Sequence, residues 1–173
     1  MSFLFRWAFK YGDDILACLT IFGNIYVTHK FRRELKLLPY ARLTCYLPVV
    51  GIGALSCYIF NNIIISSRIV KSNKCPLCVS TRATLGQIAF GLAYPLVAAT
   101  TVCFFMADRL LTYPVPPLTR APREVFNLAK RIVLKNPRPY LIIGAIHMIA
   151  SAFITFQKHD TLMKLQQQSN RNY

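Results

Sequence analysis

Four apolar runs alternate with basic segments along the chain, and this alternation sets the expected architecture. The runs cover residues 14–31, 43–67, 83–106 and 140–157. A transmembrane helix needs about 20 predominantly apolar residues. The first run is the least apolar of the four, because it contains Asn24. We therefore expect an all-α, polytopic membrane protein with four transmembrane helices in a single domain, residues 1–173.

Two further segments lie outside the apolar runs. In residues 122–136, Val125, Ala129 and Ile132 recur at helical spacing, and Pro122 suits the first turn of a helix. We expect a short amphipathic helix there, lying on the membrane surface. Residues 160–173 are predicted to form a polar tail.

The charge of the chain is strongly positive, with 21 Lys and Arg against 6 Asp and Glu. The basic residues lie almost wholly between the apolar runs, where anionic lipid such as cardiolipin would meet them. This position explains them without nucleic acid, and no RNA-binding motif is present. On the side of the first and third loops stand 12 Lys and Arg, against 9 on the other side. The bias favours both termini, with Cys75 and Cys78, on the less positive side.

Small residues and a proline mark where helices can approach one another. Glycine permits close packing in membranes, and proline bends a helix by freeing the carbonyl four residues before it. Pro95 would free the carbonyl of Gly91 in this way. The candidate helix-packing residues are Gly51, Gly53, Gly86, Gly91, Tyr94 and Pro95.

Cys75 and Cys78, in the sequence Cys-Pro-Leu-Cys, form the one arrangement with recognisable chemistry. A zinc site needs four ligands, and no second pair stands nearby, so no metal is expected. The pair could form a structural disulfide, act as a redox-active dithiol, or remain as free thiols; we favour the disulfide. His147 could be a ligand or a proton relay, but without an acidic partner in any run we expect it to hydrogen-bond a neighbouring helix.

Residues from the end of the first run to the middle of the third resemble the transmembrane protein 126 family. The matching stretches are Phe31-Arg32-Arg33, Ala41-Arg42, Leu47–Ile52, Cys75-X-X-Cys78-X-X-Thr81-Arg82 and Gly91-X-X-Tyr94-Pro95. The resemblance covers about residues 14–165 and is dense from 30 to 99. It implies a multi-pass protein of the mitochondrial inner membrane that helps to assemble the membrane arm of respiratory complex I. The implied partners are membrane-arm subunits and other assembly factors.

The chain has no paired carboxylates, glycine-rich phosphate loop or Ser/His/Asp set, so we expect no enzymatic activity and no cofactor. Two alternatives to an assembly factor stay open. One is an accessory structural subunit retained in mature complex I. The other is a membrane thiol oxidoreductase that uses Cys75 and Cys78.

Overall fold

The computed structural model describes residues 3–37, 39–67, 69, 76–115 and 122–171 and consists of helices and the turns between them. Its elements, in chain order, are α1 (Phe3–Glu34), α2 (Arg42–Tyr46), η1 (Leu47–Ile52), α3 (Gly53–Ile59), η2 (Phe60–Ser66), α5 (Pro76–Ile88), η3 (Ala89–Ala93), α6 (Tyr94–Leu110), α7 (Pro122–Leu134) and α8 (Arg138–Arg171). Elements α2 to η2 join into one continuous rod, the α2–η2 segment, and elements α5 to α6 join into a second, the α5–α6 segment.

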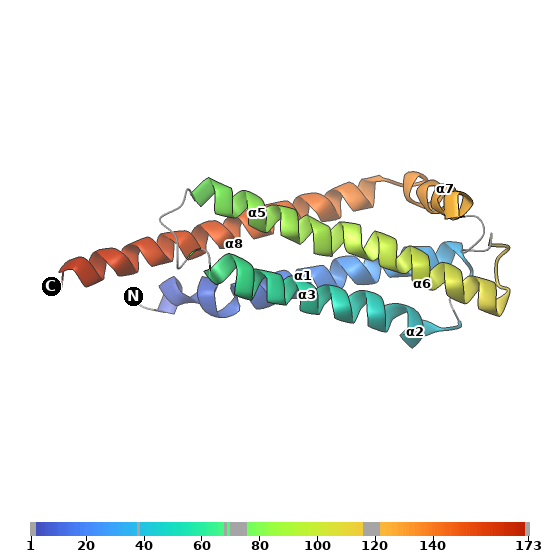
Figure 1. Ribbon diagram of the computed structural model, residues 1–173, viewed down its shortest axis with the longest axis horizontal. Coiled ribbons are helices and arrows are strands. Elements are labelled where there is room, and N and C mark those ends of the chain that lie inside the picture. Colours follow the sequence, from blue (N-terminus) through green and yellow to red (C-terminus); the bar gives the residue numbers. More distant parts are fainter. Residues whose placement is uncertain (1–2, 38, 68, 70–75, 116–121, 172–173) are drawn as a thin grey trace.

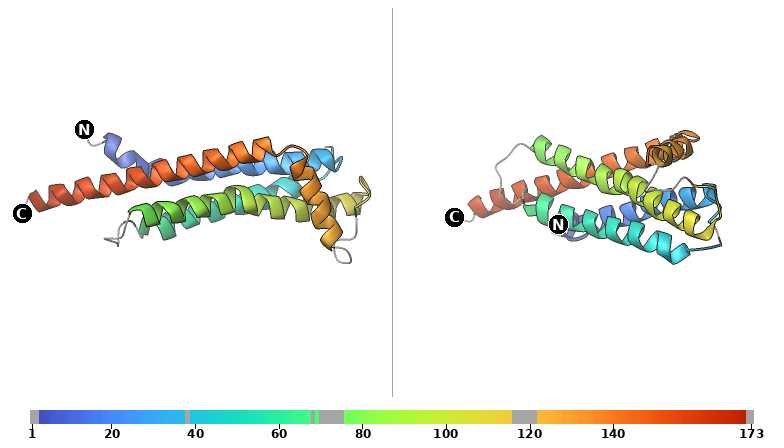
Figure 2. Two further views of the ribbon diagram at one scale, coloured as in Figure 1. Left: turned by 90° about the horizontal axis from the view of Figure 1, so that it is seen from above. Right: turned by 45° about the vertical axis from the view of Figure 1, so that its right-hand side comes forward.

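Four long rods lie side by side along the longest axis: α1, the α2–η2 segment, the α5–α6 segment and α8 (Figure 1). Both termini lie at one end of this bundle, where α5 also begins. Helix α7 lies at the opposite end and runs across the bundle rather than along it (Figure 2). The same end of the bundle therefore holds both termini and Cys78, as the sequence predicts, while the side of the membrane stays a prediction.

Three helices of the described residues are long and apolar enough to cross a membrane: Arg42–Ser66, Leu77–Leu110 and Arg138–Lys164. The remaining predicted span, the first run at residues 14–31, belongs to α1, and α1 is not one of these three helices. Thr20, Asn24 and Thr28 make α1 less apolar, and all three are fully buried against neighbouring helices. The last helix also extends further than the predicted apolar run, because α8 continues through residues 158–171.

In the two rods in the middle of the sequence, the α2–η2 and α5–α6 segments, buried positions recur at every fourth residue. In the α2–η2 segment these positions are Cys45, Val49, Gly53, Cys57, Asn61 and Ile65. In the α5–α6 segment the four-residue series is Val79, Ala83, Gln87, Gly91, Pro95, Ala99, Cys103 and Ala107, and Gly86 and Phe104 next to this series are also buried. A regular α-helix has 3.6 residues per turn, so this spacing would drift around it. Elements η1, η2 and η3 are π-helical, with wider turns in which an N–H bonds the carbonyl five residues earlier. These turns keep the buried positions on one face of each rod.

The bundle places polar groups inside and apolar groups outside. Asn24, Asn61, Gln87 and His147 are each 2% exposed or less. By contrast Phe22 is 71% exposed, and many other large apolar residues of the four rods are also exposed. A soluble protein avoids such a surface, whereas a lipid environment favours it. The arrangement therefore agrees with a membrane protein.

Candidate functional site

A polar seam joins all four rods in the middle of the bundle, and the Gln87 side chain is its centre. Gln87 Nε2 lies 3.0 Å from His147 Nδ1 of α8 and donates to Thr20 Oγ1 of α1 at 3.0 Å. Gln87 Oε1 accepts from Cys57 Sγ of α3 at 3.1 Å and from Asn61 Nδ2 at 3.4 Å. Because these partners come from the other three rods, the bonds fix the relative positions of the rods. The expectation that His147 bonds a neighbouring helix is confirmed.

The His147 ring sits against two glycines. A methyl group at Gly91 would lie 2.6 Å from the His147 ring, and one at Gly23 would lie 2.9 Å from its Nε2. The same methyl at Gly23 would lie 3.2 Å from the carbonyl oxygen of Gly91, which Pro95 cannot bond. Any side chain at Gly91 or Gly23 would therefore displace the histidine from Gln87.

Three buried polar atoms near the seam have no hydrogen-bond partner among the described residues: His147 Nε2, Ser151 Oγ and Asn24 Oδ1. Ser151 lies one turn after His147 on α8. Such atoms are the groups that a buried water would bond. The part of the chain that the structure describes holds no group of three His, Cys, Asp or Glu residues suited to a metal ion.

A buried ion pair closes the bundle at the end that carries the termini. Lys158 Nζ of α8 donates to Asp13 Oδ1 of α1 at 2.7 Å and to Ser66 Oγ at 2.9 Å. Lys158 is only 2% exposed, and its ammonium also lies 5.7 Å from the centre of the Phe9 ring. The pair links α1 to α8 and to the end of η2, so removing either partner would leave an uncompensated charge where three rods meet.

Helix α1 and Tyr94 satisfy the carbonyls of the widened turn η1. Asn24 Nδ2 donates to the carbonyl oxygen of Val49 at 3.2 Å, and Tyr94 Oη donates to that of Pro48 at 3.0 Å. Gly53 lies beneath both donors, since a methyl group there would overlap the Asn24 amide and touch the Tyr94 ring at 3.0 Å. Tyr94 and Gly53 thus hold the α2–η2 segment against α1.

The other predicted packing residues differ in their surroundings. A methyl group at Gly86 would overlap the Phe60 ring, and Pro95 is buried in the bundle. Gly51 faces outward, with nothing within 4 Å of the position that a methyl group would take. Of the predicted disulfide, Cys78 is exposed at the start of α5, and Cys75 lies outside the described residues. The pairing therefore stays a prediction.

The family model of transmembrane protein 126 matches residues 5–172 of the chain. The chain belongs to the transmembrane protein 126 family. It is 30% identical over 162 residues to transmembrane protein 126 of Drosophila melanogaster, covering 92% of this chain and 72% of that protein. It is 25% identical over 156 residues to transmembrane protein 126A of Rattus norvegicus, covering 90% of this chain and 77% of the rat protein. No solved structure matches the chain.

Two parts of the site in this member of the transmembrane protein 126 family were not predicted from the sequence. Gln87 and Asn61 lie within apolar runs, and Asp13 and Lys158 lie directly beside the ends of runs. A signal for the first pair was present. Gln87 lies four residues before Gly91 and eight before Pro95, and Asn61 lies eight after Gly53. A search for four-residue spacing would have placed both on the faces that carry the packing glycines.

Proposed function

We propose that this chain is a non-enzymatic assembly factor of the mitochondrial inner membrane, acting on the membrane arm of respiratory complex I. The observation that carries the proposal is membership of the transmembrane protein 126 family over residues 5–172. The sequence resemblance implies the assembly role, and the match along nearly the whole chain supports applying that role here.

We further propose that α1 is the fourth membrane span. The helix is 32 residues long, more than the roughly 20 that a span needs. Its polar residues Thr20, Asn24 and Thr28 all point into the bundle, while Phe22 and Ile25 point outward. A helix with this distribution presents an apolar surface to lipid although its mean hydropathy is modest.

The outer face of the α2–η2 segment is a suitable surface for a client helix. Leu47 is 70% exposed, Ile52 54% and Leu55 61%, and Gly51 lies between them. The other three glycines of the predicted packing set are occupied by contacts within the chain, whereas Gly51 is not. Small residues let a second backbone approach closely in a membrane, so Gly51 offers a notch for a helix of an unassembled subunit.

The thiol oxidoreductase alternative finds less support in the arrangement of cysteines. Such an enzyme relays electrons between two cysteine pairs. Cys78 lies near the start of the α5–α6 segment, and the buried Cys103 lies 25 residues further along it. At 1.5 Å per residue this separation is about 37 Å, far beyond direct thiol exchange. Cys45 packs in the same distant core cluster as Cys103.

The proposal is tested by depleting the protein from cells and restoring it as wild type, Gly51→Leu or Ala89→Leu. Ala89 is the control, because it is a small, exposed residue on the α5–α6 segment. Complex I amount and its assembly over time would be followed by native electrophoresis. We expect depletion to slow assembly, and wild type and Ala89→Leu to restore it more fully than Gly51→Leu. Normal complex I after depletion would contradict the assembly role, whereas equal rescue by both variants would contradict only the assignment of Gly51.

A further inference from the structure

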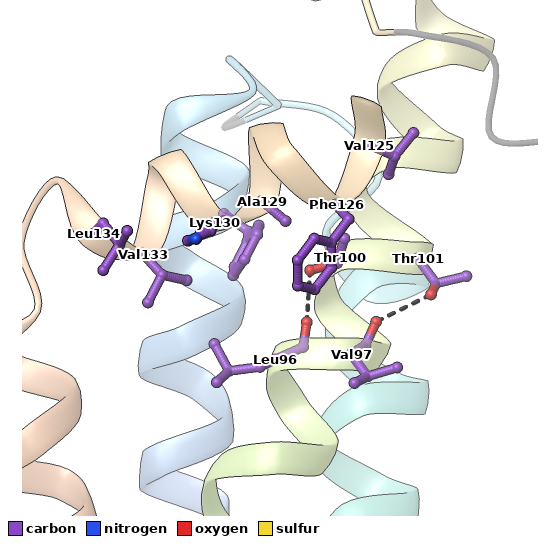
Figure 3. Close-up of a pocket in the computed structure, with 11 residues that line it drawn as sticks. Leu96, Val97, Thr100, Thr101, Val125, Phe126, Ala129, Lys130, Val133 and Leu134 are labelled. Carbon is purple, nitrogen blue, oxygen red and sulfur yellow. Dashed lines mark hydrogen bonds between the residues drawn. The ribbon is translucent and has the colours of Figure 1, made fainter. Parts of the chain in front are cut away.

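An apolar groove opens between α7 and the rods that it crosses. Its volume is about 390 Å³, and its walls come from α6, the end of α1 and the underside of α7. Figure 3 shows Phe126 of α7 lying above Thr100, with Leu96 and Val97 below. The two hydroxyls in the wall are already bonded, since Thr100 Oγ1 donates to the Leu96 carbonyl at 2.6 Å and Thr101 Oγ1 to that of Val97 at 3.0 Å. A molecule bound in the groove would therefore contact mainly carbon atoms and would find no free hydroxyl group in this wall.

A basic hollow on α7 adjoins the groove. Lys130 and Leu134 line both, and the hollow adds Arg131, Lys135 and Asn127. Lys135 is bonded to Glu34 of α1 at 3.0 Å. Lys130 and Arg131 are exposed and have no ion-pair partner among the described residues. Two cationic side chains thus lie beside the apolar groove.

We propose that this groove binds an anionic phospholipid, with one acyl chain beneath α7 and the phosphate held by Lys130 and Arg131. An occupant must combine a long apolar part with a negative charge at one end, and a phospholipid has both. The predicted position of α7 on the membrane surface would place the cations at headgroup depth and the groove in the hydrocarbon. The proposal is independent of the assembly role, because it concerns lipid alone.

The test uses the full chain in phosphatidylcholine nanodiscs with a tryptophan placed in the groove by Phe126→Trp. Trp7, the one natural tryptophan, is replaced by Phe. Quenching of this tryptophan is measured while mid-chain brominated phosphatidylglycerol or brominated phosphatidylcholine is added. We expect the anionic lipid to quench at a far lower mole fraction than the zwitterionic one.

Three variants separate a built site from general attraction to charge. Lys130→Gln with Arg131→Gln should weaken the preference for the anionic lipid by roughly 25-fold, about fivefold for each cation near the surface. Arg123→Gln is the matched control, since this exposed arginine is on the same helix but lines neither hollow, and it should change the preference less than twofold. Val97→Phe fills the groove from an exposed position and should also remove the preference. Circular dichroism checks that each variant keeps its helices.

Several results would overturn the proposal. Equal quenching by both lipids would show ordinary annular lipid. A loss of about fivefold with Arg123→Gln, equal to the loss for each cation of the double variant, would show diffuse attraction, and a preference that survives Val97→Phe would show that no chain enters the groove. Loss of the preference with inorganic phosphate, but not with chloride at equal ionic strength, would assign the cations to free phosphate. Cross-linking from position 126 to a protein in native membranes would assign the groove to a partner helix.

Discussion

The two faces of the α2–η2 segment differ in what they contact. The face toward α1 carries Val49, Gly53, Cys57 and Asn61 at four-residue spacing, and each contacts another rod. The face turned away carries Leu47, Gly51 and Leu55, all exposed. Both faces contain a glycine, but a side chain at Gly53 would overlap Asn24, whereas one at Gly51 would meet nothing within 4 Å.

This difference separates residues that hold the chain together from exposed residues that the proposed client could contact. In lipid, apolar surface gives little drive for helices to associate, so small residues and hydrogen bonds must supply the contact. On the inner faces, small residues and hydrogen bonds hold the rods of this chain together. The outer face around Gly51 keeps a small residue that the fold does not use, and this is the property expected of a docking surface.

Gly91→Leu should cost the most. The new side chain would push His147 away from Gln87, adding an overpacking cost of about 1–3 kcal/mol to a similar cost for the broken hydrogen bonds. We expect a loss of about 2–6 kcal/mol of unfolding free energy, measured in detergent, or failure of the protein to accumulate. Gly51→Leu is the matched control and should change stability by less than about 0.5 kcal/mol. Similar losses from both variants would remove the distinction between inner and outer glycines.

Lys158→Met should destabilise the bundle by about 3–5 kcal/mol, because it leaves Asp13 buried without its counter-charge. Replacing both partners, with Asp13→Leu and Lys158→Met, should recover most of the loss, since an apolar pair leaves no uncompensated charge. Thermal unfolding of the two single variants and the double variant gives the coupling free energy between Asp13 and Lys158. Additive losses would show that the ion pair does not act as a unit.

Gln87→Leu should destabilise by about 1–2 kcal/mol, in line with hydrogen bonds measured between membrane helices. It removes the bonds to Thr20, His147 and Cys57 while keeping a similar volume. Gln167→Leu, at an exposed position on α8, is the control and should have no measurable effect. An equal effect of the two substitutions would deny the seam a structural role.

Glu34→Gln should have the smallest effect, about 0.5 kcal/mol, because the ion pair with Lys135 lies near the surface. The hydrogen bond from Lys135 lowers the pKa of the Glu34 carboxyl below its usual value of 4.5. The carboxylate therefore stabilises the contact of α1 with the end of α7 at pH 7, and this contribution is lost as the pH falls below about 4.5. The difference in melting temperature between wild type and Glu34→Gln should be present at pH 7 and vanish near pH 3. A difference that is unchanged at pH 3 would assign it to something other than the charge.

The sequence predicts the helical class, the family and a small-residue packing set, because apolar runs and glycine positions are local properties. It does not separate Gly51 from Gly53 and Gly91, since which face turns inward depends on the widened turns that reset the helical phase. Nor does it identify the Asp13–Lys158 pair, whose members are 145 residues apart. The first apolar run is less apolar than the other three, because Thr20, Asn24 and Thr28 lower its hydropathy, and only the structure shows that all three are buried in the bundle.

The central claim, that this protein assists assembly without remaining in the product, is tested most directly by where it migrates. Mitochondria solubilised mildly would be separated by native electrophoresis, and the endogenous protein and the membrane-arm subunits quantified in each slice by mass spectrometry. We expect the protein to comigrate with membrane-arm subassemblies and to be absent from mature complex I. One copy in each mature complex would contradict the claim and indicate an accessory subunit. Comigration with no complex I subunit at all would contradict both.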